Sequence, residues 1–142
     1  MHAKTLMVLL IVLAAAGLLA GCGQSEEEKA TDQVCIARDD IAKQVDQLKG
    51  LTLTTATTDQ VQNNVQAIRD DLAKIADARA NLSDNQRTQV EQANDAFRSE
   101  MGNIAATVAR STSIEEASAQ LKAAFNDLAA TYNKTFGQID CS

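Results

Sequence analysis

The chain has 142 residues, of which 45% are hydrophobic, 23% are charged and 3% are aromatic. It contains no Pro and no Trp, which argues against an all-β sandwich, because such folds favour β-branched and aromatic residues and many turns. The net charge of −6 opposes the phosphate backbone of a nucleic acid, so we expect no nucleic-acid partner. The length is that of one domain.

The first 22 residues have the pattern of a bacterial secretory signal. Lys4 precedes an apolar run of 14 residues, 6–19, which is shorter than the roughly 20 residues that span a bilayer. The run ends in Leu19-Ala20-Gly21-Cys22. This sequence resembles the lipobox of bacterial lipoproteins, in which a branched aliphatic residue and two small residues precede a Cys. The alternatives are an uncleaved anchor, or a plain secretory signal followed by an unrelated Cys.

The resemblance implies that residues 1–21 are a signal peptide and that the sulfur of Cys22 carries a diacylglyceryl group. Two or three acyl chains, such as palmitate, would hold a small protein almost permanently on a membrane. Gly23 stands where an Asp would favour retention at the inner membrane. We therefore expect an extracytoplasmic protein on the outer face of the cell membrane, or on the outer membrane where the host has one.

Residues 22–30 are expected to form the lipidated Cys and a short tether. Glu26, Glu27 and Glu28 would be repelled by anionic headgroups and would hold the body away from the lipid. An equally favoured alternative is an early start of the first helix, because Ser25 and Glu28 fit a capping box.

From about residue 31, apolar residues recur every three or four positions, which is the spacing of amphipathic helices. Four such stripes follow one another and predict helices near residues 31–49, 58–80, 84–110 and 113–136. The stripe residues are Val34, Ala37, Ile41, Val45 and Leu48; Val61, Val65, Ile68, Leu72, Ile75 and Leu82; Val90, Ala93, Phe97, Met101, Ile104 and Val108; and Ile114, Ala117, Leu121, Phe125, Leu128, Tyr132 and Phe136.

The breaks between the stripes carry helix start and stop signals. Gly50 is expected to end the first helix at the position after its last residue. The later helices start at S/T-x-x-E/Q capping boxes, formed by Thr57 with Gln60, Ser83 with Gln86, and Ser113 with Glu116. The last two connections are short, which favours antiparallel neighbours. We therefore predict an all-α fold for residues 31–142, an antiparallel up-down-up-down four-helix bundle.

The connection over residues 51–57 is longer and rich in Thr. We expect a plain loop in which Leu51 and Leu53 cover one end of the core. The alternative is that its threonines carry glycans.

Two cysteines remain if Cys22 carries lipid, namely Cys35 and Cys141. An even number outside the cytoplasm favours a disulfide, which needs Cα atoms roughly 4.4–6.8 Å apart. In a bundle of four helices the start of the first helix and the end of the last lie at the same end, whereas in three helices they would be about 30–40 Å apart. We therefore predict a Cys35–Cys141 disulfide. The alternatives are two free thiols or a redox pair, although no C-x-x-C sequence is present.

From Cys22 onward the chain has no His. Ser-His and Cys-His nucleophiles, zinc sites with His ligands and the E-x-x-H motif of di-iron bundles are therefore excluded. The acidic doublets Asp39-Asp40 and Asp70-Asp71 could serve as a glycosidase pair or as a weak cation site, but we expect them to be solvated helix faces. We accordingly predict no enzymatic activity, no catalytic residue, no metal and no cofactor.

Two residues depart from their stripes. Arg79 occupies an apolar position, where we expect its stem to extend toward water near a helix end; a buried ion pair or a ligand contact is the alternative. Gly102 lies inside the third predicted helix, where we expect it to allow close helix packing or a small kink beside Met101; a ligand groove is the alternative.

These features together favour a non-catalytic, lipid-anchored helical bundle that presents an interaction surface to an unidentified envelope protein or ligand. The alternative function is a small-molecule-binding sensor or accessory module. That alternative predicts a pocket in the bundle core near Met101, Gly102 and Tyr132.

Overall fold

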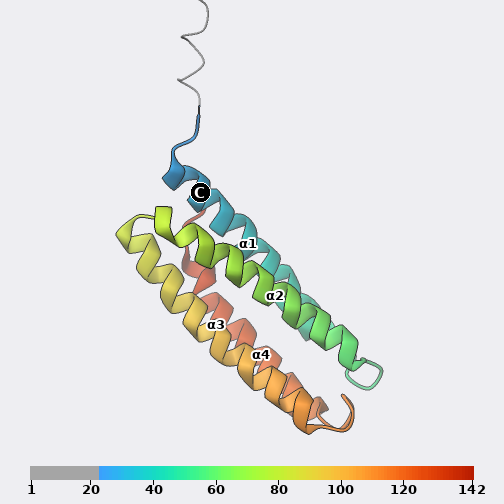
Figure 1. Ribbon diagram of the computed structural model, residues 1–142. Helices are drawn as coiled ribbons and strands as arrows, with labels where there is room; N and C mark the ends of the chain where they lie inside the picture. Colours follow the sequence, from blue (N-terminus) through green and yellow to red (C-terminus); the bar gives the residue numbers. More distant parts are fainter. Residues whose placement is uncertain (1–22) are drawn as a thin grey trace, which may run out of the picture.

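The computed structural model describes residues 23–142, and these residues form an all-helical structure (Figure 1). In chain order the elements are α1 (Glu26–Gly50), α2 (Thr58–Ala78), the short 3₁₀ helix η1 (Arg79–Asn81), α3 (Asp84–Arg110), α4 (Ser118–Lys134) and the 3₁₀ helix η2 (Phe136–Gln138). The prediction of an all-α fold with four helices is confirmed.

The start of α1 lies five residues before the predicted residue 31. Ser25 forms a complete capping box, in which the Glu28 N–H donates to Ser25 Oγ at 3.1 Å and the Ser25 N–H donates to Glu28 Oε2 at 2.9 Å. The carboxylates of Glu26 to Glu28 in the first turn also suit the positive end of the helix dipole. Residues 26–30 are therefore helical, which agrees with the alternative prediction of an early helix start and not with a tether over these residues.

The other boundaries match in part. Helix α3 begins and ends at the predicted residues, whereas α2 ends at Ala78 and passes into η1. The prediction that Gly50 follows α1 is wrong. Gly50 is the last helical residue, and the chain leaves the helix at Leu51, which has an extended backbone. Among the described residues none has a positive φ, so the end of α1 does not use the left-handed conformation for which glycine is favoured.

Helix α4 begins at Ser118, five residues later than predicted. Ser113 Oγ does accept the Glu116 N–H at 3.1 Å, but the Glu116 carboxylate bonds to Thr112 instead of returning to Ser113. The capping box is therefore incomplete, and residues 114–117 form turns before α4 starts.

Each α-helix packs against two others: α1 contacts α2 and α4, and α3 contacts α2 and α4. Figure 1 shows the α1–α2 loop and the α3–α4 connection at one end of the body. The start of α1, the α2–α3 connection and the C-terminus lie at the other end (Figure 1).

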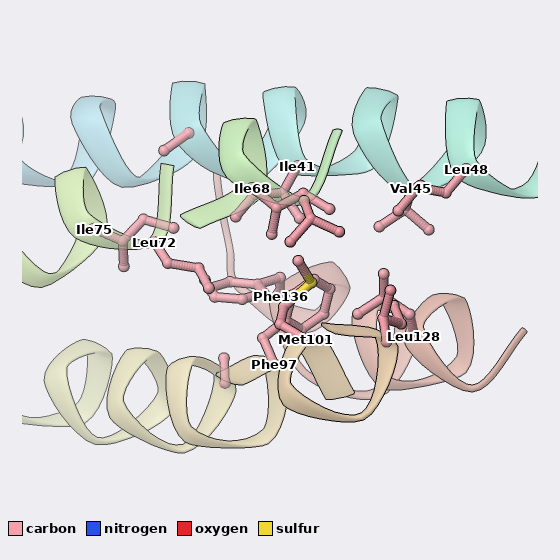
Figure 2. Packing of buried hydrophobic residues seen from close by; sticks show 14 of the residues in the cluster. Ile41, Val45, Leu48, Ile68, Leu72, Ile75, Phe97, Met101, Leu128 and Phe136 are labelled. Atoms are coloured by element: carbon pink, nitrogen blue, oxygen red, sulfur yellow. The ribbon is translucent and has the colours of Figure 1, made fainter. Parts of the chain in front are cut away.

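The predicted apolar stripes form the core between these helices. Figure 2 shows side chains from α1 and α2 meeting Phe97, Met101 and Phe136 from the opposite side. Val108 and Tyr132 are half-buried rather than buried, and Thr107 is buried beside Val108. Leu51 and Leu53 pack against the core, which confirms their predicted place at the end of the bundle.

Candidate functional site

The predicted lipidation site, Cys22, and the predicted signal peptide, residues 1–21, lie outside the described residues. The described part of the chain starts immediately after them, and Ser25 is the N-cap residue of its first helix, α1. Only two residues therefore separate Cys22 from the N-cap of α1.

The structure joins Cys35 and Cys141 in a disulfide, with Cα atoms 5.7 Å apart. This bond connects the third turn of α1 to the segment that follows η2. The same segment is held by a second contact, because Arg38 Nη1 donates to the Ile139 carbonyl at 2.9 Å. Ile139 itself is buried in the core. The C-terminal residues are thus fastened to α1 by a covalent bond and a hydrogen bond, and Ile139 packs into the core.

The first acidic doublet lies at the surface of α1. Asp39 is exposed and accepts hydrogen bonds from its neighbour Arg38, whereas Asp40 is half-exposed and pairs with Lys43 at 2.9 Å. The ammonium of Lys43 lowers the pKa of Asp40 below its ordinary value through this hydrogen bond. A carboxyl held in its charged form is a poor general acid, so Asp40 does not suit the acid role in an acid-base pair.

The expectation of a fully solvated face is wrong for the second doublet. Asp70 is exposed, but the side chain of Asp71 is 6% exposed and pairs with Lys74 at 2.7 Å. Successive residues on a helix point about 100° apart, so one of two adjacent aspartates can enter the interface. Asp71 forms its pair one turn along α2. Among residues 23–142, no three or more His, Cys, Asp or Glu side chains gather in a group that could hold a metal ion.

Arg79 behaves as predicted. It lies in η1 after the last turn of α2, with an exposed side chain whose Nη1 is 3.3 Å from Glu91 Oε1. The buried position belongs to the preceding residue, Ala78.

Gly102 contradicts the prediction of close helix packing. It is exposed, and a Cβ built on it would meet no atom within 4 Å. Met101, next to it, is buried in the core. Tyr132 places its ring 6.3 Å from that of Phe97 and donates its hydroxyl to the Arg38 carbonyl at 3.4 Å. Met101 and Gly102 therefore face different environments and do not line a common pocket with Tyr132.

An open groove of about 520 Å³ runs between the first half of α2 and the second half of α3. Val61, Val65, Ile104 and Val108 are among its apolar lining residues, and Arg69 is among the polar ones. This volume is within the range of roughly 300–1,000 Å³ that small-molecule sites occupy. The groove lies between α2 and α3, and Met101, Gly102 and Tyr132 are not among the residues that line it.

Two further residues have unusual environments that the stripes did not indicate. Asn94 is 7% exposed, and its Oδ1 has no hydrogen-bond partner in the structure. Ile36 is 65% exposed, although it lies between the buried residues Val34 and Ala37. Ile36 could have been noticed in the sequence, because it is an apolar residue outside its stripe.

Within the part of the chain that the structure describes, no helix has both the length and the apolar character needed to cross a membrane. Comparison with models of protein families, with curated proteins and with solved structures found no match to this chain.

Proposed function

We propose that this protein is a bacterial lipoprotein, held on the outer side of a membrane by acyl chains on Cys22. The observation that carries the proposal is the sequence Leu19-Ala20-Gly21-Cys22 directly after an apolar run of signal-peptide length. The short distance from Cys22 to the N-cap Ser25 is consistent with it, since a lipidated mature chain would enter its folded domain almost at once. A disulfide between Cys35 and Cys141 also suits an oxidising compartment outside the cytoplasm.

We further propose that the helices are arranged up-down-up-down with antiparallel neighbours. The observations that support this are the neighbouring helix pairs, the short connections and the bond that joins the start of α1 to the C-terminal segment. In this arrangement the loop over residues 51–57 is at the end far from the start of α1, where it is available to other molecules of the cell envelope.

The body of the protein acts in this proposal as a non-catalytic module that presents its surface to an envelope protein or a ligand. Acidic side chains dominate that surface, because the chain from Cys22 onward has 19 Asp and Glu against 12 Lys and Arg. A partner with a basic surface would therefore meet favourable charge.

Mass spectrometry of the protein purified from bacterial membranes tests the lipoprotein proposal. We expect a mature chain that starts at Cys22 and carries the mass of its acyl groups. The Cys22→Ala variant should lack both the cleavage and the acyl mass, and it should keep its apolar signal segment, residues 6–19. An unmodified Cys22 in the purified wild-type protein would overturn the proposal.

Affinity capture then tests the interaction role. The wild-type protein and the Cys22→Ala variant would be crosslinked in intact cells and purified from equal amounts of material. We expect a specific envelope protein with the anchored form and its loss with the variant.

The α2–α3 groove favours a second candidate function, a module that binds a small molecule. Ala105 lies in the groove wall and is half-buried, so Ala105→Trp should fill the space without removing core volume. Native mass spectrometry would compare small molecules that accompany the wild-type protein and this variant. A bound molecule lost on substitution would favour the binding module over the interaction surface.

A further inference from the structure

Ile36 lies on a small, mostly apolar area at the side of the bundle. The hollow beside it is lined by residues from α1 and from α2, including Lys29, Asp32, Gln33 and Lys74. Gln33 Nε2 donates to the Lys74 carbonyl at 3.2 Å, so the two helices share this surface. We call the surface formed by Lys29, Asp32, Gln33, Ile36 and Lys74 the Ile36 face.

The length of chain before α1 limits how far this face can be from a membrane that holds Cys22. Three peptide units lead from Cys22 to Ser25, and fully extended chain spans at most about 3.6 Å per residue, or about 11 Å here. Ile36 is ten residues along α1 from Glu26, which is about 15 Å along the helix axis. Tilting the bundle toward the membrane therefore brings Ile36 to the lipid surface without any change in its fold.

Charge distinguishes the two surfaces that could meet the lipid. The end of the bundle at the start of α1 carries Glu26, Glu27 and Glu28 in one helical turn, and anionic headgroups repel them. The Ile36 face carries two lysines and one aspartate. Lys29 pairs with Glu26 and Lys74 pairs with Asp71, so the charges on and beside the Ile36 face nearly offset one another, and this face is less acidic than the end of the bundle.

We propose that the Ile36 face lies against the lipid surface in which Cys22 is anchored, with the Ile36 side chain among the headgroups. The proposal rests on the lipid anchor of the proposed function. The anchor makes the contact intramolecular, so that a small apolar area is enough to select an orientation. The domain without its anchor is accordingly expected not to bind vesicles. The consequence is a tilted bundle that turns α3 and α4 toward the surroundings.

Tryptophan fluorescence tests this orientation, because the natural chain has no Trp. The Ile36→Trp variant would be compared with Ala130→Trp, which places the same probe at an exposed position of α4 near the same end of the bundle. Both mature lipidated proteins, which start at Cys22, would be reconstituted into vesicles of phosphatidylethanolamine and phosphatidylglycerol, with and without brominated acyl chains. We expect the emission of the Ile36→Trp variant to shift to shorter wavelength and to be quenched by bromine. The Ala130→Trp variant should show neither effect.

Flotation of the vesicles separates failure of the anchor from failure of the orientation. If the wild-type protein does not float with the vesicles, the lipid anchor and the orientation are both overturned. If the proteins float but the two variants have the same solvent-exposed, unquenched emission, the anchor stands and the orientation is wrong. A shift of the Ile36→Trp emission to shorter wavelength without bromine quenching would mean that protein, and not lipid, covers the face. In these vesicles that protein could only be a second copy of this chain. This result would also overturn the proposal.

Discussion

Phe97 and Phe136 pack edge to face, with their ring centroids 5.2 Å apart and their planes at 75°. Phe97 belongs to α3, whereas Phe136 is in η2, beyond the end of α4. Both side chains are fully buried (Figure 2). The chain after α4 therefore returns its aromatic side chain to the middle of the core and belongs to the folded domain.

Removing this ring should destabilise the whole domain. We expect Phe136→Ala to lower the free energy of unfolding by about 3–5 kcal/mol, because it removes buried apolar surface and leaves a cavity beside Phe97. Urea denaturation followed by circular dichroism measures the change. The exposed neighbour Asn133 supplies a control, since Asn133→Ala should change stability by less than about 0.5 kcal/mol. Equal effects of the two substitutions would contradict the packing described for Phe136.

The disulfide should make a second large contribution. Cys35 and Cys141 are separated by 106 residues in sequence, and a crosslink over a loop of this size stabilises by about 4.7 kcal/mol in the chain-entropy model. We expect the Cys35→Ser/Cys141→Ser double variant to lose stability of this order in urea denaturation. Reduction of the wild-type protein should produce a similar loss.

Thiol labelling of the unfolded, unreduced wild-type protein provides the chemical control. With the bond formed, neither Cys35 nor Cys141 should react until a reductant is added. Two reactive thiols without reductant would show that the pair is not oxidised in the purified protein.

The core could be predicted from the sequence because its positions repeat at the helical period. Ile41, Ile68 and Phe97 all lie on predicted stripes and are all fully buried. The start of α4 could not be predicted in this way. Ser113 and Glu116 have the residue types and spacing of a capping box, but the Glu116 carboxylate accepts a hydrogen bond from the Thr112 hydroxyl instead. Sequence spacing does not distinguish these two arrangements.

The candidate sites were predictable to different degrees. Pairing of Cys35 with Cys141 followed from the number of helices and the count of cysteines. Burial of Asp71 was not predictable, because either member of the Asp70-Asp71 doublet can point inward and the choice depends on how α2 packs. Gly102 was misinterpreted for a related reason. The presence of a glycine inside a helix does not show whether that position faces a neighbouring helix or water.

Gly102 offers a simple way to increase stability. A Cβ there meets nothing within 4 Å, and Ala is favoured over Gly inside a helix by about 1 kcal/mol. We therefore expect Gly102→Ala to raise the free energy of unfolding by about that amount. At Gly137 a Cβ would lie 3.3 Å from the Tyr132 carbonyl oxygen, so Gly137→Ala should give no such gain. A loss of stability in Gly102→Ala would indicate a close neighbour that the structure does not contain.

Asn94 is expected to lower the stability of the core. Its Nδ2 reaches the Leu72 carbonyl at 3.5 Å, the limit of a hydrogen bond, and its buried Oδ1 has no partner. An unsatisfied buried polar group costs about 1–3 kcal/mol, so Asn94→Leu, which has the same branched shape without the polar atoms, should stabilise the protein. Thermal unfolding measures the gain. Asn94→Ala provides the contrast, because it removes the amide but leaves a cavity and should give less stability than Asn94→Leu.

Acid should weaken the α3–α4 connection. The Glu116 carboxylate accepts hydrogen bonds from the Thr112 hydroxyl at 2.6 Å and from the Thr112 N–H at 2.8 Å, and these bonds lower the pKa of Glu116 below its ordinary value. A carboxyl whose pKa is lower in the folded state stabilises the fold above its ordinary pKa, and the stabilisation is lost as the pH falls through the lowered value. We expect the free energy of unfolding to decrease as the pH drops below about 4.

The Glu116→Gln variant isolates this contribution from that of other carboxyls. It should be less stable than the wild type at pH 7, and the difference should shrink as both proteins are brought into acid, because the wild-type carboxyl then becomes protonated. Glu115→Gln removes the same charge from the adjacent exposed position and controls for the change in net charge. A difference between Glu116→Gln and wild type that stays constant from pH 7 into acid would contradict the assigned role of the Thr112 hydrogen bonds.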